Sequence, residues 1–232
     1  MSTYSIAELT VNMEPFGKTV VQAEKYLIAP KESADITLTY SIDNMKHYLA
    51  HHPEISEESY VYMLLGKKFA ECLLDYDGLV LHSSAIAYEN KAYLFSADSG
   101  TGKSTHTSFW TKCFDGAEVI NDDKPALRLM DGIFYAYGTP WSGSTPINLN
   151  VKVPLQAICF IERADKNSIE RITDNAEIIK LFMPQTLRHV GNDKAEKLML
   201  NLEKLISNIP FYKLRCLPNE DAAKLAYEIM SK

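Results

Sequence analysis

The chain has 232 residues, of which 46% are hydrophobic and 23% charged, values typical of a globular protein with a buried core. Its net charge of -6 argues against nonspecific nucleic-acid binding, because no basic excess is present to neutralise phosphates. The four cysteines are far apart and form no C-x-x-C pair, so zinc and redox motifs are not indicated. No signal peptide or membrane-spanning stretch is apparent, and we expect a cytoplasmic protein without membrane contacts.

The N-terminal third predicts strands followed by a long helix. Residues 4–11, 19–28 and 34–42 are rich in β-branched and aromatic residues and predict three strands. Ser56 is a plausible N-cap for the helix that follows, and Gly78 comes just past its expected end. We therefore expect a small N-terminal α/β subdomain over residues 1–77 and a second domain over residues 78–232.

The second domain is predicted to begin with strands and to contain further strands between its helices. Two apolar strands meet at the turn Glu89-Asn90, and Asp131-Gly132 between two apolar runs is a strong hairpin signal. A doubly wound domain would continue with alternating strands and helices instead. The sequence thus predicts an α/β (α+β) fold with a mixed, largely antiparallel sheet. The further expected elements are strands at 117–122, 155–163, 168–173 and 211–217 and helices at 104–114, 174–189, 193–208 and 219–232.

The stretch SADSGTGKST, residues 96–105, nearly matches the phosphate-binding pattern G-x-x-x-x-G-K-[ST], with Ala97 in the first position. Glycines let the backbone turn its N–H groups toward an anion, Lys103 can reach phosphates, and the Ser104 hydroxyl can bind Mg²⁺. A methyl group at Ala97 is tolerable if the local φ is negative. The predicted ATP-binding residues are Ser99, Gly100, Thr101, Gly102, Lys103, Ser104 and Thr105.

Two adjacent carboxylates, Asp122 and Asp123, follow the next apolar strand. One carboxylate at such a strand end can hold Mg²⁺, and its neighbour can take the proton from an attacking hydroxyl. Ser104 and Asp123 are therefore candidate metal ligands, although the sequence does not divide the two roles between the aspartates.

Together, LHSSAI, SADSGTGKST and VINDD resemble the C-terminal kinase domain of bacterial HPr kinase/phosphorylase and, more distantly, ATP-dependent phosphoenolpyruvate carboxykinase. The resemblance covers roughly residues 78–165 and implies a carboxykinase-like P-loop fold. It also implies that His82, fifteen residues before Ala97, lies near the transferred phosphate and orients an aspartate. Ser83 stands where HPr kinases usually have glycine, and their downstream arginine-glycine signature is absent, so HPr itself is not the expected acceptor.

The sequence predicts an ATP- and Mg²⁺-dependent phosphotransferase, with Asp122, Asp123, His82 and Lys103 as catalytic candidates and ATP and Mg²⁺ as cofactors. The expected partners are ATP and an unidentified hydroxyl-bearing peptide, protein or small molecule, without nucleic acid; a homo-oligomer is left open. The alternatives are a nucleotide-binding regulator without transfer activity and an ordinary P-loop ATPase with a doubly wound sheet. The loop GTPWSGSTP, residues 138–146, is either a lid or substrate contact, or a plain surface loop.

Overall fold

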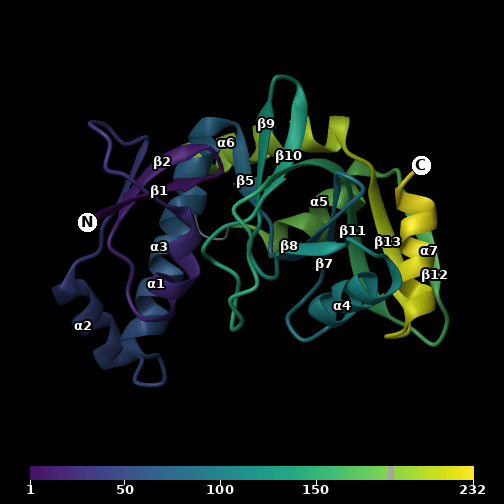
Figure 1. The fold of residues 1–232 in the computed structure, drawn as a ribbon, viewed down its shortest axis with the longest axis horizontal. Coiled ribbons are helices and arrows are strands. Elements are labelled where there is room, and N and C mark those ends of the chain that lie inside the picture. The colour runs from purple at the N-terminus through teal and green to yellow at the C-terminus, as the bar shows by residue number, and fades with distance from the viewer. Residues whose placement is uncertain (188–190) are drawn as a thin grey trace.

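The computed structural model describes residues 1–187 and 191–232, which form two sheets with helices packed on them (Figure 1). The smaller sheet has four strands in the order β3-β1-β2-β4. Its strands are β1 (Ser2–Ile6), β2 (Leu9–Met13), β3 (Leu27–Ile28) and β4 (Ile36–Leu38). Ala7 and Glu8, both with positive φ, form the turn that joins β1 to β2.

The strand predicted for residues 19–28 is wrong, because most of this segment is helical. Helix α1 (Lys18–Ala23) and a 3-10 turn (Glu24–Tyr26) precede the two residues of β3. Val20 and Val21, which suggested a strand, are exposed, whereas Thr19, Gln22 and Ala23 are buried. Burial at a spacing of three to four residues is the helical period, so tertiary packing overrides the β-propensity of the two valines.

The long helix α3 (Glu57–Leu73) begins as predicted, with the Ser56 hydroxyl accepting a hydrogen bond from the Ser59 amide. It is preceded by α2 (Ile42–His51) and followed by a 3-10 turn, Leu74–Tyr76. The left-handed residue that ends this turn is Asp77, with φ 51°, and not Gly78. Gly78 already belongs to a strand, where an added Cβ would lie 2.9 Å from the Leu127 carbonyl oxygen.

The larger sheet has nine strands and is mixed, as expected. Its main path runs β5-β9-β10-β11-β7-β6-β8, with β13 beside β11 and β12 beside β13. Over the described residues, β11 pairs in parallel with β7 and β13, and the other six strand pairings are antiparallel. The strands are β5 (Gly78–Val80), β6 (Ser83–Tyr88), β7 (Lys91–Ser96), β8 (Glu118–Asn121), β9 (Ala126–Met130), β10 (Ile133–Tyr137), β11 (Lys152–Arg163), β12 (Ser168–Ile172) and β13 (Phe211–Cys216).

Both predicted hairpins are present in this sheet. Glu89 and Asn90 turn β6 into β7, and Asp131 and Gly132 turn β9 into β10, with all four residues at positive φ. The chain therefore passes from β8 into a hairpin, where a doubly wound domain would place a helix. The reading as a doubly wound ATPase is wrong for this reason.

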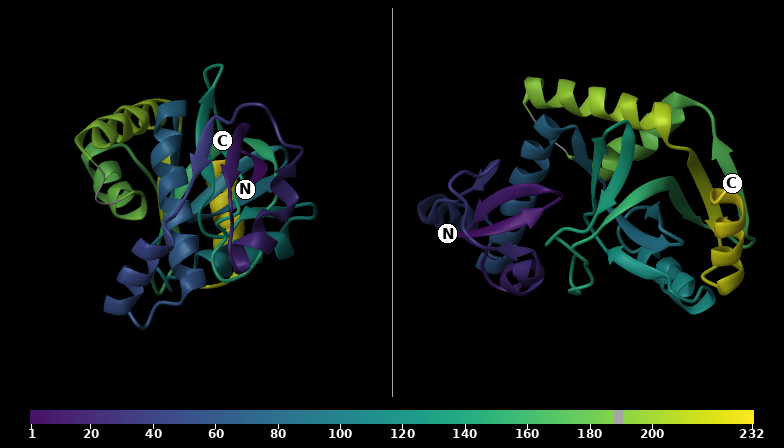
Figure 2. Two further views of the ribbon diagram at one scale, coloured as in Figure 1. Left: turned by 90° about the vertical axis from the view of Figure 1, so that its left-hand side faces the viewer. Right: turned by 45° about the horizontal axis from the view of Figure 1, so that its top comes forward.

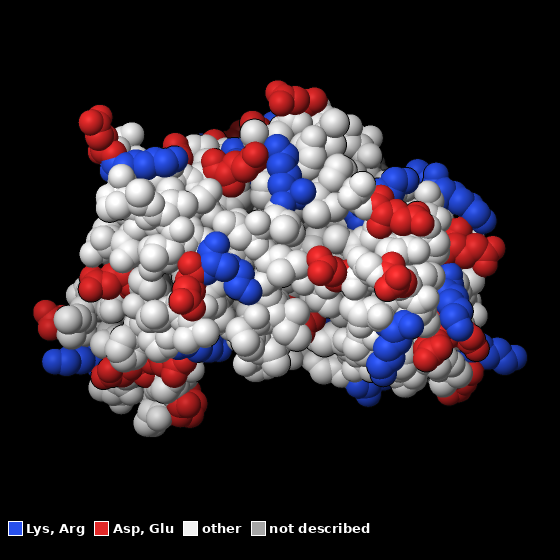
Figure 3. Space-filling model, viewed as in Figure 1, with Lys and Arg blue, Asp and Glu red and all other residues white. Residues whose placement is uncertain are grey.

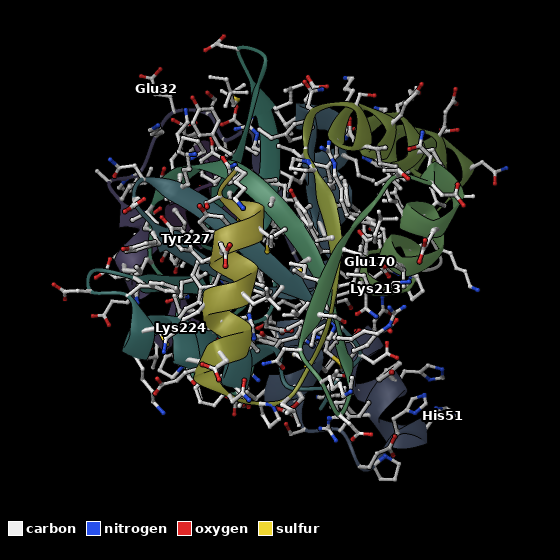
Figure 4. All side chains as sticks on the ribbon, turned by 90° about the vertical axis from the view of Figure 1, so that its right-hand side faces the viewer. Glu32, His51, Glu170, Lys213, Lys224 and Tyr227 are labelled. Carbon is white, nitrogen blue, oxygen red and sulfur yellow. The ribbon has the colours of Figure 1, made fainter. Side chains whose placement is uncertain are left out.

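Helices cover both faces of the larger sheet (Figure 2). On one face, α4 (Lys103–Cys113) and α7 (Glu220–Met230) share a buried cluster with β7 and β13. α7 lies in front of the strands in Figure 4, and its Tyr227 hydroxyl donates to Glu89 Oε2 at 2.8 Å. On the other face are α5 (Asn175–Phe182) and α6 (Asn192–Asn208).

The helix predicted over residues 174–189 corresponds to α5, which is followed by a 3-10 turn that ends at Gln185. Its predicted positions 188 and 189 lie outside the described residues.

The smaller sheet and α3 share one hydrophobic cluster with residues of the larger sheet and its loops. Trp141, 1% exposed, stacks on Phe69 of α3 with ring centroids 5.0 Å apart. The cluster also takes in Val80, Ala126 and Tyr137 from the larger sheet. The hydrophobic core is continuous across the predicted domain boundary between residues 77 and 78. The boundary itself stays a prediction.

Acidic and basic side chains are interspersed on the face shown in Figure 3, without a continuous basic surface there. Across the described part of the chain, no helix is both long enough and apolar enough to cross a membrane. All four cysteines are free, with Cys159 and Cys216 buried and Cys72 and Cys113 partly exposed.

We expect Trp141→Ala to lower the free energy of unfolding by about 3–5 kcal/mol, because it removes the largest buried side chain between the two sheets. Urea denaturation at 25 °C measures this change. Leu200→Ala, at an α6 position that is 51% exposed, is the control and should change stability by less than about 0.5 kcal/mol. Equal losses in the two variants would contradict the shared core.

Candidate active site

The strand register brings three chain segments to one edge of the larger sheet. β6 runs antiparallel between β7 and β8, so β7 and β8 end at the edge where β6 begins. Ser96, the last residue of β7, pairs with Ser83, and Asn121, the last residue of β8, pairs with Ala85. The phosphate-binding-like loop, His82 and the aspartate pair therefore meet, although they are up to 41 residues apart in sequence.

The loop between β7 and α4 has the backbone conformation that its glycines allow. Gly100 has φ 77° and Gly102 has φ 123°, values that L side chains rarely adopt. Nothing lies within 4 Å of a Cβ built at either glycine, so the backbone angle and not crowding requires glycine there. α4 begins at Lys103, one residue before the predicted start.

Ala97 occupies its position without backbone strain. It is absent from the residues with positive φ, and its methyl group is buried in the cluster that packs α4 and α7 on the sheet. The backbone φ of Ala97 is therefore negative, as an alanine at this position requires.

Two cations hold the carbonyl groups of the loop. Lys103 Nζ donates to the carbonyl of Ala97 at 2.9 Å and to that of Asp98 at 3.4 Å. Arg163, at the end of β11, donates to the carbonyls of Gly100 and Thr101, the latter at 3.0 Å. Burial lowers the Lys103 pKa, and the nearby carboxylates of Asp123 and Asp122 oppose that shift.

The N-terminus of α4 can accept an anion. Among the described residues, no side chain caps the helix at Gly102. The amides of the first helical turn have no partner within a helix, and the helix dipole favours negative charge at this end. With the loop carbonyls bonded to Lys103 and Arg163, this end of the helix has the chemistry of a phosphate site.

The aspartate pair is positioned by Asn121, whose side-chain oxygen accepts hydrogen bonds from the amides of Asp123 at 3.0 Å and Lys124 at 2.7 Å. Asn121 is fully buried, and its amide nitrogen donates to the Thr139 carbonyl at 2.9 Å. This bond network fixes the turn after β8. Asp122 Oδ1 accepts a hydrogen bond from the buried Ser84 hydroxyl at 2.7 Å, on the side facing α4.

Asp123 faces three protonatable groups. Its Oδ1 lies 3.4 Å from His82 Nε2 and 3.9 Å from Lys124 Nζ, and its Oδ2 lies 3.4 Å from the Tyr62 hydroxyl. The Tyr62 hydroxyl donates a long hydrogen bond to this carboxylate, and the Lys124 ammonium lies within ion-pair distance of it. Burial, followed by the charge of Asp123, raises the pKa of Tyr62, so its phenol stays protonated.

The tautomer of His82 is fixed from the other side of the ring. Gln185 Nε2 donates to Asp98 Oδ1 at 2.7 Å, which leaves Gln185 Oε1 to accept from His82 Nδ1 at 3.0 Å. The neutral imidazole then carries its proton on Nδ1 and presents the Nε2 lone pair to Asp123. Burial is the main cause that lowers the His82 pKa, followed by the charge of Lys103, while Asp123 raises it.

His82, the glycines of the loop, the start of α4 and both aspartates line one cleft of about 350 Å³. Thr101 lies on the other side of the loop, where it lines two neighbouring cavities together with Arg163. The residues that line the cleft are His82, Ser99, Gly100, Gly102, Lys103, Ser104, Thr105, Asp122, Asp123, Ser142, Gly143 and Ser144.

Sequence reasoning missed several residues of this site. Tyr62 and Gln185 come from distant segments, and no local pattern marks either residue. Ser84 lies within the LHSS stretch, where its place one residue beyond Ser83 at the start of β6 offered a signal. The loop 138–146 is a wall of the cleft and not a plain surface loop, because the Gly143 amide donates to the Tyr62 hydroxyl at 2.8 Å.

The oxygen ligands in the cleft suit Mg²⁺, which binds through one or two carboxylates together with water and phosphate oxygens. Ser104 and both aspartates offer such oxygens. No cluster of three or more His, Cys, Asp or Glu side chains that could enclose a metal occurs in residues 1–187 and 191–232. An all-protein metal cage is therefore not present there, and the donor set fits a metal that is held jointly with a phosphate.

No protein-family model matches the chain, and no curated protein matches it by sequence. Among solved structures, it is similar to the Hpr(Ser) kinase/phosphatase from Coxiella burnetii. The identity is 10% and the TM-score 0.40, over 66% of this chain and 88% of that chain. This similarity is distant and assigns no activity to this chain.

We expect His82 to titrate below its usual pKa of 6.5 in an NMR titration of the imidazole protons. Lys103→Met should raise the pKa because it removes a cation, and Asp123→Asn should lower it further because it removes an anion. The contribution of this group to stability is present above pH 6.5 and is lost as the pH falls through the lower folded-state pKa. A midpoint at or above 6.5 in the folded protein would contradict this environment.

Proposed function

We propose that the protein is an ATP- and Mg²⁺-dependent phosphotransferase that acts on a hydroxyl group. The observation that carries the proposal is that an anion-binding helix terminus, Lys103, Ser104 and two carboxylates line the same cleft. This combination suits phosphoryl transfer, because its catalysis depends mostly on positioning and on neutralising charge.

The phosphates of ATP would lie against the first-turn amides of α4 and the loop glycines. Lys103 is buried to 7% exposure and is held by the loop itself, so its charge would already be positioned before the nucleotide binds. Bound Mg²⁺ would neutralise phosphate charge that the protein's own cations do not. Ser104 and one carboxylate would hold it.

The sequence named Asp123 as a candidate metal ligand but left the two roles undivided, and the contacts favour Asp123 as the proton acceptor and Asp122 as the metal ligand with Ser104. Asp123 faces His82, Tyr62 and Lys124, whereas Asp122 accepts from Ser84 beside α4. As the acceptor oxygen forms its bond to the γ-phosphorus, its proton would pass to Asp123. The bond between the γ-phosphorus and the β,γ-bridging oxygen would break, and ADP would leave.

His82 would act through Asp123. With its proton on Nδ1, its Nε2 lone pair lies 3.4 Å from Asp123 Oδ1 and would accept a hydrogen bond from that carboxyl once Asp123 has taken up the proton of the acceptor. The alternative function, nucleotide binding without transfer, needs only the loop and the helix terminus. The contacts around Asp123 favour transfer, since phosphate binding alone has no use for a carboxylate set between an imidazole and a phenol.

Lys103→Ala should weaken ATP binding by roughly 10- to 100-fold, because a hydrogen-bonded charge on the phosphates is lost. Isothermal titration calorimetry with MgATP measures the affinity, and circular dichroism checks the fold. Lys112→Ala, in the last turn of the same helix, is the matched control. Affinity like that of the original chain in a folded Lys103→Ala variant would remove the phosphate site from this loop.

Asp123→Asn should reduce phosphotransfer by roughly 10²- to 10⁴-fold, since it removes a general base, while MgATP affinity stays within about twofold. Asp122→Asn should instead raise the Mg²⁺ concentration needed for half-maximal transfer. The assay follows the γ-phosphate of radiolabelled ATP into an extract of the source organism.

Asp115→Asn, at an exposed position after α4, should transfer like the original chain and serves as the control. If the original chain binds ATP but labels nothing, and both aspartate variants bind ATP equally well, the regulator is the better assignment.

A further inference from the structure

A second cavity, of about 500 Å³, lies beside the cleft and shares His82 with it. Its walls come from α3 of the N-terminal segment and from the segment 184–187. The residues that line it are Tyr62, Met63, Gly66, Lys67, Ala70, Val80, His82, Lys124, Pro184, Gln185, Thr186 and Leu187. It therefore adjoins Asp123, which contacts three of these side chains: Tyr62, His82 and Lys124.

The interior of this cavity offers mainly apolar surface. Met63, Ala70, Val80 and Leu187 contribute hydrocarbon, and several polar groups in the walls are bonded within the protein. The Thr186 hydroxyl donates to the Val80 carbonyl at 2.7 Å, and the Gln185 side chain is bonded at both its nitrogen and its oxygen. A ligand would therefore be held there mostly by burial of its own apolar surface.

The charged groups in the walls are cationic. Lys67 and Lys124 line the cavity, and its described lining residues include no aspartate or glutamate. Lys67 lies 3.6 Å from Glu71, an exposed ion pair of a kind that contributes little, and Lys124 lies 3.9 Å from Asp123. The Lys67 ammonium can thus exchange this contact for a ligand anion at small cost.

We propose that this cavity binds the phosphoryl acceptor, a compound that carries its hydroxyl on an apolar body and also bears an anionic group. The assignment rests on the proposed transferase activity. The apolar body would lie against α3, the anion would pair with Lys67, and the hydroxyl would face Asp123, beside Lys124. The N-terminal segment, which supplies five of the lining residues from α3, would then select the acceptor.

The first test is equilibrium binding without nucleotide, measured by isothermal titration calorimetry. The probes are 3-(4-hydroxyphenyl)propionate, which is apolar and anionic, and tyramine, which has the same phenol with a cationic chain. We expect the propionate to bind and tyramine to bind at least roughly tenfold more weakly, a difference of about 1.4 kcal/mol. No binding of the propionate, or equal binding of the two, would overturn the assignment.

Two variants locate the binding. Met63→Trp fills the cavity from a position that is 47% exposed, and Met199→Trp, 41% exposed on α6, is its matched control. Lys67→Gln removes one cation, and Lys68→Gln, the next residue of the same helix, is the control for it. We expect the Met63 and Lys67 variants to weaken probe binding by roughly tenfold or more, and the controls to change it less than about twofold.

MgATP affinity separates this inference from the proposed function. Met63→Trp and Lys67→Gln should leave it unchanged, and a loss of ATP binding in both would identify the cavity as a nucleotide site and overturn the inference. If probe binding follows the expected pattern but the original chain binds no MgATP, the transferase proposal fails while the cavity remains a ligand site. If MgATP binds and is used but neither variant affects the probe, the acceptor assignment alone fails.

Discussion

The antiparallel position of β6 between β7 and β8 brings the loop, His82 and the two aspartates to one edge of the sheet. Because side chains alternate along a strand, a shift of one residue in either pairing would turn Ser84 away from Asp122 and bury the wrong face. Neighbouring strands stabilise the pairing of β6 with β7. β7 also pairs with β11, and β11, which has twelve residues, pairs in turn with β13. The site therefore depends on a register that the whole sheet maintains.

Around this edge, hydrogen bonds within the protein hold the charged and polar side chains in place. Lys103 and Arg163 hold the loop carbonyls, Asn121 holds the turn with the aspartates, and Gln185 holds the imidazole. Lys103, Asn121 and Gln185 are buried, and buried polar groups are stable only when they have partners. Such preorganisation reduces the reorganisation that a charged transition state would otherwise require.

Sequence reasoning predicted the parts of the site that are local. The glycines, Lys103 and the aspartate pair follow from short-range chemistry, and the hairpin at Asp131-Gly132 follows from turn geometry. Tyr62 could not be predicted, because it lies 61 residues from Asp123 and its role depends on how α3 packs on the sheet. The helix α1 was missed for a related reason: its two exposed valines favour a strand, and only the burial of Gln22 and Ala23 by tertiary contacts reverses that preference.

Side chains of α1 and of the residues just after it donate hydrogen bonds to the loop 138–146 and to residues 148 and 149, and so attach this loop to the N-terminal segment. Gln22 donates to the Gly143 carbonyl at 3.2 Å, Lys25 to the Asn148 carbonyl at 2.6 Å and Tyr26 to the Leu149 carbonyl at 3.2 Å. A shortened chain that began at residue 78 would keep the glycine-rich loop and both aspartates. It would nevertheless lose these three donors, along with Tyr62 and Phe69, the aromatic partner of Trp141. The loop 138–146, which forms one wall of the cleft, would then no longer be fixed in position.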